Sequence, residues 1–209
     1  MTGLLLAYSL ALIVNLLGHA RHERALTVVG KLGGSTIFLI IALRGGVLAH
    51  EWGRWMFVGL CCGWIGDACL LGKHRRSFVA GLAAFLLGHL AYATAFVVHG
   101  IELAFAALAL ALLVIPGVLV TRWLVPHVPE RLRVPVRIYL ATISMMVALA
   151  CAAWQAGAPA SVFVGALAFY ASDLSVARER FVTKQLANRL WGLPAYYLGQ
   201  LLLAIGARA

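Results

Sequence analysis

Charged side chains are scarce in this chain: 11% of the residues are Asp, Glu, Lys or Arg, whereas 63% are hydrophobic. A soluble globular domain carries roughly 25% charged residues, so this composition excludes a soluble protein. Lipid rather than water must cover most of the surface. A membrane helix takes about 20 apolar residues, so the chain has room for about eight such helices and for no soluble domain.

The motifs of several common site types are also missing. The four cysteines form neither a CxxC pair nor a zinc spacing, and their apolar surroundings predict reduced packing residues. GxSxG and Gly-rich phosphate loops are absent. Only His89 lies well inside an apolar run, so we expect no metal site and no cofactor. The GxGD of intramembrane aspartyl proteases is absent as well, because the stretch 63–67 reads GWIGD.

The apolar runs predict an all-α fold, a polytopic membrane helix bundle that forms a single transmembrane domain over residues 1–209. About eight transmembrane helices are expected, and several are short enough to favour a thin or tilted bundle. Their predicted ranges are Gly3–Gly18, Leu26–Leu43, Trp55–Leu71, Phe78–Val98, Leu103–Val120, Val134–Ala153, Ser161–Ala177 and Leu190–Ile205.

Basic residues gather in every second gap between these runs, while the alternate gaps hold only Arg44 and Arg54. Cytoplasmic loops are rich in Lys and Arg, so we expect the basic loops to face the cytoplasm of a bacterial inner (plasma) membrane and both termini to lie outside. Topology and contact with anionic membrane lipids then explain the net charge of +10, and no nucleic acid partner is expected. The sequence does not indicate an oligomeric state.

Two acidic residues, Asp67 and Asp173, lie inside the predicted spans, and the other five lie in loops or at span ends. A charge within a span costs at least a few kcal/mol and usually has a function. Each Asp lies about one turn before the cytoplasmic end of its helix, roughly 6–9 Å below the surface. The alternative is that each pairs with a basic loop residue or caps a helix.

Two carboxylates in a site of low dielectric constant repel each other, so one should hold its proton while the other stays charged. Such an acid and base suit the cleavage of an acetal-like or ether bond. Other polar residues fall in the same layer, although each alone is also typical of an interfacial tyrosine or a snorkelling lysine. They are Asn15, Lys31, Tyr139, Tyr196, Tyr197 and Gln200, with His89 and Tyr92 deeper.

A faint internal repeat relates the two halves of the chain. The triplet Phe-Val-Gly begins ten residues before Asp67 and again ten residues before Asp173. Lys31 precedes Asp67 by the same interval that separates Arg137 from Asp173. Two parallel four-helix repeats would bring both Asp-bearing helices to one centre, but apolar sequences also match by chance.

A set of short motifs occurs in order along nearly the whole chain. They are Gly66-Asp67; Phe85, Gly88-His89 and Tyr92; Arg137, Tyr139 and Met145; Ser172-Asp173 and Phe181; and Tyr196-Tyr197 with Gln200. In these motifs the sequence resembles the YhhN family of membrane proteins, whose characterised members are lysoplasmalogenases. The family often has Lys-Pro where this chain has Lys31-Leu32, which leaves the role of Lys31 open.

The resemblance implies hydrolysis of the vinyl ether bond of a lysophospholipid substrate, the lysoplasmalogen, to a fatty aldehyde and a glycerophospho-ethanolamine or -choline. Asp67 and Asp173 would be catalytic: one donates a proton to the alkene carbon, and the other, ionised, stabilises the oxocarbenium ion and activates water. Which Asp is the acid stays open. The rival is a proton-coupled membrane transporter or lipid carrier that uses the same pair. A transporter site should lie near the midplane, whereas both carboxylates are expected toward one face.

Overall fold

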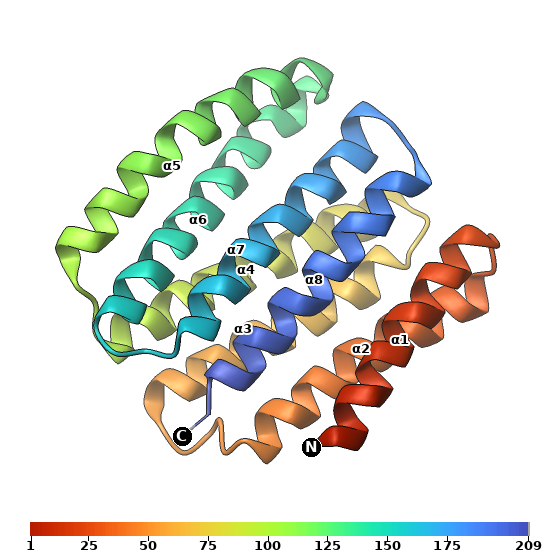
Figure 1. The fold of residues 1–209 in the computed structure, drawn as a ribbon. Helices are drawn as coiled ribbons and strands as arrows, with labels where there is room; N and C mark the ends of the chain where they lie inside the picture. Colours follow the sequence, from red (N-terminus) through yellow and green to blue (C-terminus); the bar gives the residue numbers. More distant parts are fainter. Residues whose placement is uncertain (209) are drawn as a thin grey trace.

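The computed structural model describes residues 1–208 and contains eight α-helices, with no strand among those residues (Figure 1). Every helix predicted from the apolar runs is present, with ends within about one turn of the prediction. The helices are α1 Thr2–Ala20, α2 Arg24–Arg44, α3 Glu51–Leu70, α4 Arg75–His99, α5 Leu103–Leu124, α6 Glu130–Gln155, α7 Ala160–Ala177 and α8 Leu186–Gly206, with a short 3₁₀ helix η1 Val125–His127 and a π-helical turn η2 Arg178–Val182.

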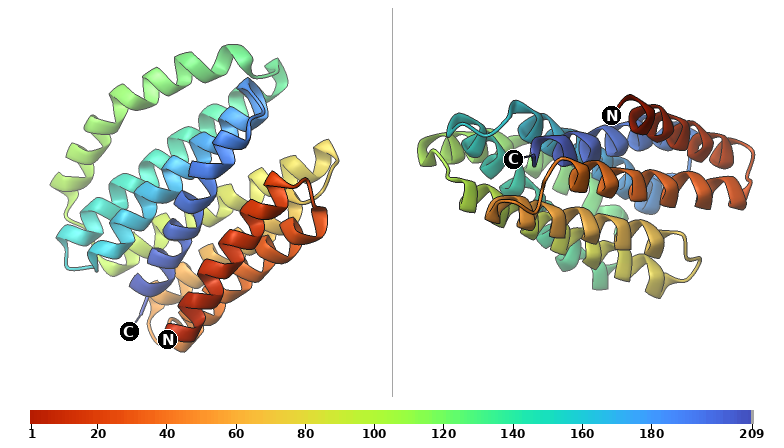
Figure 2. Two further views of the ribbon diagram at one scale, coloured as in Figure 1. Left: turned by 45° about the vertical axis from the view of Figure 1, so that its right-hand side comes forward. Right: turned by 90° about the horizontal axis from the view of Figure 1, so that it is seen from below.

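Six helices are long and apolar enough to cross a membrane, and α3 and α8 are the two that are not among them. Both are more polar because α3 carries Arg54 and Asp67, and α8 carries Asn188, Arg189 and Gln200. Their 20 and 21 residues still reach about 30 Å, the thickness of a bilayer core. They run alongside the other helices (Figure 2). The predicted all-α membrane bundle is therefore confirmed. Six of its eight helices are long and apolar enough to cross a membrane by length and composition alone.

The two halves of the chain pack on each other in the same way. Helix α2 packs against α3 of its own half and against α8 of the other half. Helix α6 likewise packs against α7 of its own half and against α4 of the other. This is the pairing expected of two parallel four-helix repeats, although the repeat itself stays a prediction. The peripheral helix α5 buries only Leu124.

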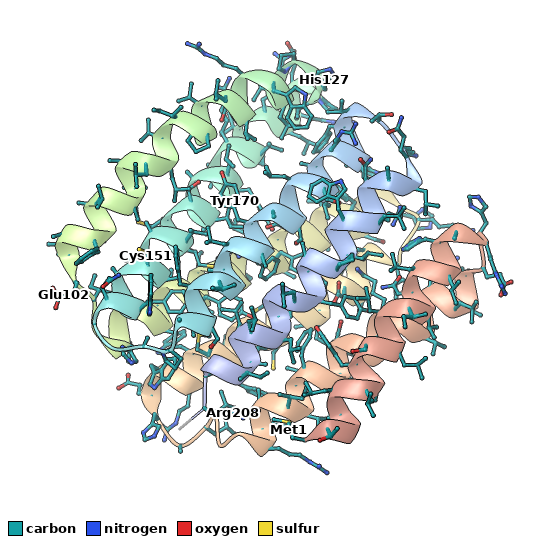
Figure 3. All side chains as sticks on the ribbon, in the orientation of Figure 1. Met1, Glu102, His127, Cys151, Tyr170 and Arg208 are labelled. Atoms are coloured by element: carbon teal, nitrogen blue, oxygen red, sulfur yellow. The ribbon has the colours of Figure 1, made fainter. Side chains whose placement is uncertain are left out.

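The four connections that follow α1, α3, α5 and α7 lie at one end of the bundle, and both termini lie at the other (Figure 1). We call the first the basic end, because it carries the basic residues of the segments 21–24, 73–76, 131–133 and 178–189. At the opposite end, Arg208 Nη2 lies 3.7 Å from Met1 Sδ, and Figure 3 shows both residues. The side of the membrane that each end faces stays a prediction.

Buried glycines let aromatic side chains of α4 and α8 lie directly on α2 and α3. A Cβ atom at Gly66 would lie 2.6 Å from Phe85 Cε2, and one at Gly34 would lie 2.6 Å from Tyr197 Cε1. Small residues of this kind allow close helix approach in membranes. At Gly63 on α3 a Cβ atom would clash with Gln200 of α8, so a glycine also lets the polar groups of α8 approach α3, which carries Asp67.

Candidate active site

A cavity of about 380 Å³ opens between the helices near the basic end, and both Asp67 and Asp173 line it. Most of the lining is apolar and includes Leu82, Phe85 and Ile143. Four other residues predicted from the sequence line the same cavity: Lys31, Tyr139, Ser172 and Tyr196. An apolar space with a few converging polar groups is the usual form of a binding site for an apolar ligand.

Asp67 is fully buried, and both of its oxygens have partners. Lys31 Nζ forms an ion pair with Oδ1 at 2.8 Å. Tyr196 donates its hydroxyl proton to Oδ2 at 2.6 Å, and the Ser35 hydroxyl donates to the same oxygen. These partners come from α2 and α8, so the charge of Asp67 is balanced within the bundle rather than by a loop residue.

A chain of hydrogen bonds continues from Tyr196 away from the cavity. Gln200 Nε2 donates to the Tyr196 hydroxyl at 3.2 Å, and Tyr92 donates to Gln200 Oε1 at 2.8 Å. Both Gln200 and Tyr92 are fully buried. They do not line the cavity, so we infer that they hold Tyr196 in place and do not meet a ligand.

Asp173 has a different environment. Tyr139 donates to Oδ2 at 2.9 Å, and His89 Nε2 lies 3.0 Å from the same oxygen and 2.9 Å from the Tyr139 hydroxyl. No residue in 1–208 bonds to Oδ1, and the Asp173 side chain is 16% exposed. One oxygen is thus fixed by the protein, while the other is available at the cavity wall.

The two carboxyl groups are held by separate partners, and no hydrogen bond joins them within residues 1–208. The prediction that mutual repulsion sets their protonation stays a prediction. Lys31 supplies a positive charge to Asp67, whereas Tyr139 and His89 contact Asp173. The two carboxyl groups therefore differ in their partners.

Asn15 and Tyr197 have a structural position outside the cavity. Asn15 Nδ2 donates to the Tyr197 hydroxyl at 3.2 Å, and that hydroxyl donates to the Gly30 carbonyl oxygen at 2.8 Å. Tyr8 in turn donates to the Tyr197 carbonyl oxygen at 2.7 Å. This cluster joins α1, α2 and α8 and so supports the helices that carry Lys31 and Tyr196.

Sequence reasoning missed Ser35 and Tyr170. Ser35 lies one turn after Lys31 on α2, a spacing that could have indicated a shared face. Tyr170, marked in Figure 3, lines the cavity one turn before Asp173, and its buried hydroxyl has no partner within residues 1–208. Arg137, which the repeat pairs with Lys31, does not line this cavity and is exposed on α6.

The donor set does not favour a metal centre. Within residues 1–208, no group of three His, Cys, Asp or Glu side chains is placed to hold a metal ion. His89 has Asp173 as its one acidic neighbour, and the cysteines lie unpaired.

Comparisons with known proteins identify the family of this chain. The sequence model of the YhhN family matches residues 26–207. Lysoplasmalogenase TMEM86A of Bos taurus is 31% identical over 178 residues, which cover 82% of this chain and 72% of that protein. Lysoplasmalogenase of Mycobacterium tuberculosis is 31% identical over 181 residues, which cover 80% of this chain and 67% of that protein. No solved structure matches the chain. The chain belongs to the YhhN family.

Proposed function

We propose that this protein is a lysoplasmalogenase, which hydrolyses the vinyl ether bond of a lysoplasmalogen to a fatty aldehyde and glycerophospho-ethanolamine or -choline. The names of its relatives support the activity. The observation that carries the proposal is a carboxyl group with one oxygen fixed and one free, Asp173, at the wall of an apolar cavity. An alkenyl chain fits this cavity because its lining is largely apolar.

Asp173 is the acid in this proposal. A general acid must reach the atom that it protonates, and Oδ1 of Asp173 is the carboxyl oxygen without a protein partner. Tyr139 and His89 both hold Oδ2, so a proton on Oδ1 leaves these contacts intact. Asp67 is less suited to donate a proton, because it is the anion of an ion pair and both of its oxygens are engaged.

The reaction then balances without a cofactor. Asp173 transfers its proton to the outer alkene carbon, which leaves an oxocarbenium ion at the ether carbon. The negative charges of Asp67 and of the newly ionised Asp173 stabilise this cation. Water adds to the cation and returns a proton to Asp173. The resulting hemiacetal collapses to the aldehyde and the free glycerol hydroxyl.

We place the basic end of the bundle at the cytoplasmic face, since Lys and Arg are enriched in cytoplasmic loops. The cavity then opens in the cytoplasmic half of a bacterial inner membrane, and both termini lie outside. Its lining residues come from this end and from the middle of the helices, such as Leu71 just after α3, Phe78 at the start of α4 and Ile143 in the middle of α6. We expect lysophospholipids to enter the cavity from the inner leaflet.

A transporter that uses the same carboxylates is the alternative. Its substrate path would have to continue to the opposite end of the bundle. That half is filled by buried side chains such as Phe38, Met56 and Phe96, each with no exposed surface. This packing leaves little room for a substrate path through the bundle and so favours an enzyme over a transporter. Substrate flux into proteoliposomes without turnover of lipid would reverse the ranking.

The test is aldehyde release from lysoplasmalogen by purified protein, with Asp173→Asn and Asp67→Asn as variants. We expect Asp173→Asn to abolish turnover and Asp67→Asn to lower it strongly. Asn has nearly the same shape as Asp, so elution as a single species in detergent checks that each variant is folded. Wild-type activity in folded Asp173→Asn would contradict the mechanism.

A further inference from the structure

The mouth of the cavity is lined by basic side chains that the reaction does not use. Two of its lining cations are already paired within the protein. Lys31 is paired with Asp67 at 2.8 Å, and Arg189 Nη2 is paired with Glu179 Oε1 at 3.1 Å. The other two, Arg180 and Lys184, are exposed and form no ion pair with any residue in 1–208.

Arg180 is held in a defined place although it has no ion pair. Its guanidinium carbon lies 4.3 Å from the centre of the Phe78 ring, a cation–π contact that leaves the N–H groups free. Phe78 itself packs edge-on against Phe181. This contact favours a position of the Arg180 guanidinium at the mouth, where it can donate hydrogen bonds outward.

The segment that carries both cations is tied to α8. Glu179 accepts hydrogen bonds from the Gln185 backbone N–H at 3.1 Å and from Asn188 Nδ2 at 2.9 Å. Asn188 Nδ2 also donates to the Thr183 carbonyl oxygen at 2.7 Å. These contacts use Glu179, the one acidic side chain at the mouth among residues 1–208, so within that range no carboxylate there neutralises Arg180 and Lys184.

Arg180 stands seven residues, or two helical turns, after Asp173. At 1.5 Å per residue the two are separated by roughly 10 Å along the helix axis. Both line the same cavity. A ligand that reaches from Asp173 to Arg180 would thus have its reactive bond inside the bundle and an anionic group at the mouth.

We propose that Arg180 and Lys184 form a phosphate subsite that binds the phosphodiester of the lysophospholipid headgroup. This inference rests on the proposed function, because the ligand must extend from the mouth to Asp173. Arginine donates in a planar fork that matches phosphate oxygens, and lysine adds a second point charge. The subsite orients the lipid with its headgroup at the basic end and its alkenyl chain between the helices.

The kinetic test compares lysoplasmalogen with 1-alkenylglycerol, which has the same vinyl ether and no phosphate. The variant is Arg180→Gln/Lys184→Gln, and the matched control is Lys73→Gln/Arg76→Gln, which removes two exposed cations at the same end outside the cavity lining. We expect the ratio of kcat/KM for lysoplasmalogen to that for alkenylglycerol to fall at least tenfold in the first variant. In the control the ratio should stay within twofold of wild type.

Equal losses on both substrates, or equal losses in both variants, would overturn the subsite. Bulk anionic lipid is the other source of phosphate. A change that occurs only in micelles containing phosphatidylglycerol would assign these cations to bulk lipid and would also overturn the proposal.

Binding of labelled lysophosphatidylcholine, which has no vinyl ether, separates this proposal from the proposed function. Binding that is at least tenfold weaker in the Arg180→Gln/Lys184→Gln variant than in wild type supports the subsite. Failure of the wild-type protein to release aldehyde would reject the proposed function alone and would leave this binding result in force. Unchanged binding in the variant would reject the subsite.

Discussion

Lys31 and Asp67 form an ion pair inside the bundle, with Lys31 Nζ 2.8 Å from Asp67 Oδ1. The pair joins α2 to α3, and the Asp67 side chain is 1% exposed. Removing one partner of a buried pair leaves the other charge uncompensated. The pair is therefore a structural link between the two helices, and Lys31 balances the charge of the Asp67 carboxylate at the cavity.

Lys31→Met should destabilise the protein by about 3–5 kcal/mol, because it leaves the Asp67 carboxylate buried without its cation. Thermal unfolding in detergent measures the change. The double variant Lys31→Met/Asp67→Asn should recover much of the stability, since it removes both charges. A single variant as stable as wild type would show that the ion pair does not form.

Tyr196→Phe and Tyr197→Phe should have different effects although the residues are adjacent. The Tyr196 hydroxyl bonds to Asp67 at the cavity, so its loss should lower kcat at least tenfold. The Tyr197 hydroxyl bonds to Asn15 and Gly30 outside the cavity. Its loss should cost about 1–3 kcal/mol of stability through unsatisfied partners and leave kcat nearly unchanged. The same kcat in both variants would argue against this division of roles.

Tyr170→Phe should lower kcat/KM for lysoplasmalogen several-fold without loss of stability. The Tyr170 hydroxyl is buried at the cavity and has no partner within residues 1–208, so its removal breaks no protein hydrogen bond. We expect a bound substrate oxygen to be the partner that the variant loses. Steady-state kinetics with an unfolding scan on the same sample tests this. A large fall in melting temperature would instead indicate a structural role.

Gly34→Ala and Gly33→Ala are a matched pair on α2. A Cβ atom at Gly34 would lie 2.6 Å from Tyr197 Cε1, whereas one at Gly33 meets nothing within 4 Å. Gly34→Ala should therefore push α2 from α8 and lower both stability and activity. Gly33→Ala should be neutral or should stabilise by up to about 1 kcal/mol through helix propensity. Equal melting temperatures would contradict the close approach of the two helices.

Metal chelation should leave the activity unchanged. The proposed reaction uses carboxyl groups alone, and residues 1–208 provide no group of three metal-ligating side chains. Aldehyde release is measured after dialysis against EDTA, and Zn²⁺ or Mg²⁺ is then added back. Loss of activity that one of these ions restores would contradict the acid–base mechanism.

The amino-acid sequence by itself determined the membrane class, the eight helices and the end of the bundle at which the carboxylates lie. These properties depend on local composition: apolar runs define helices, and Lys and Arg mark alternate loops. The cost of a charge within a span was enough to single out Asp67 and Asp173. None of these inferences depends on which helices pack against each other.

Only the tertiary structure decided which partners each carboxyl group has. In the sequence, Ser35 has the pattern of an ordinary helical serine and Lys31 that of a snorkelling lysine. In the structure, α2 packs against α3, and both side chains contact Asp67. Arg137 is predicted by the repeat to match Lys31, but the rotation of α6 exposes Arg137 and brings Tyr139 to Asp173. Helix rotation and packing depend on contacts across the whole bundle, so the pattern along the chain does not encode them locally.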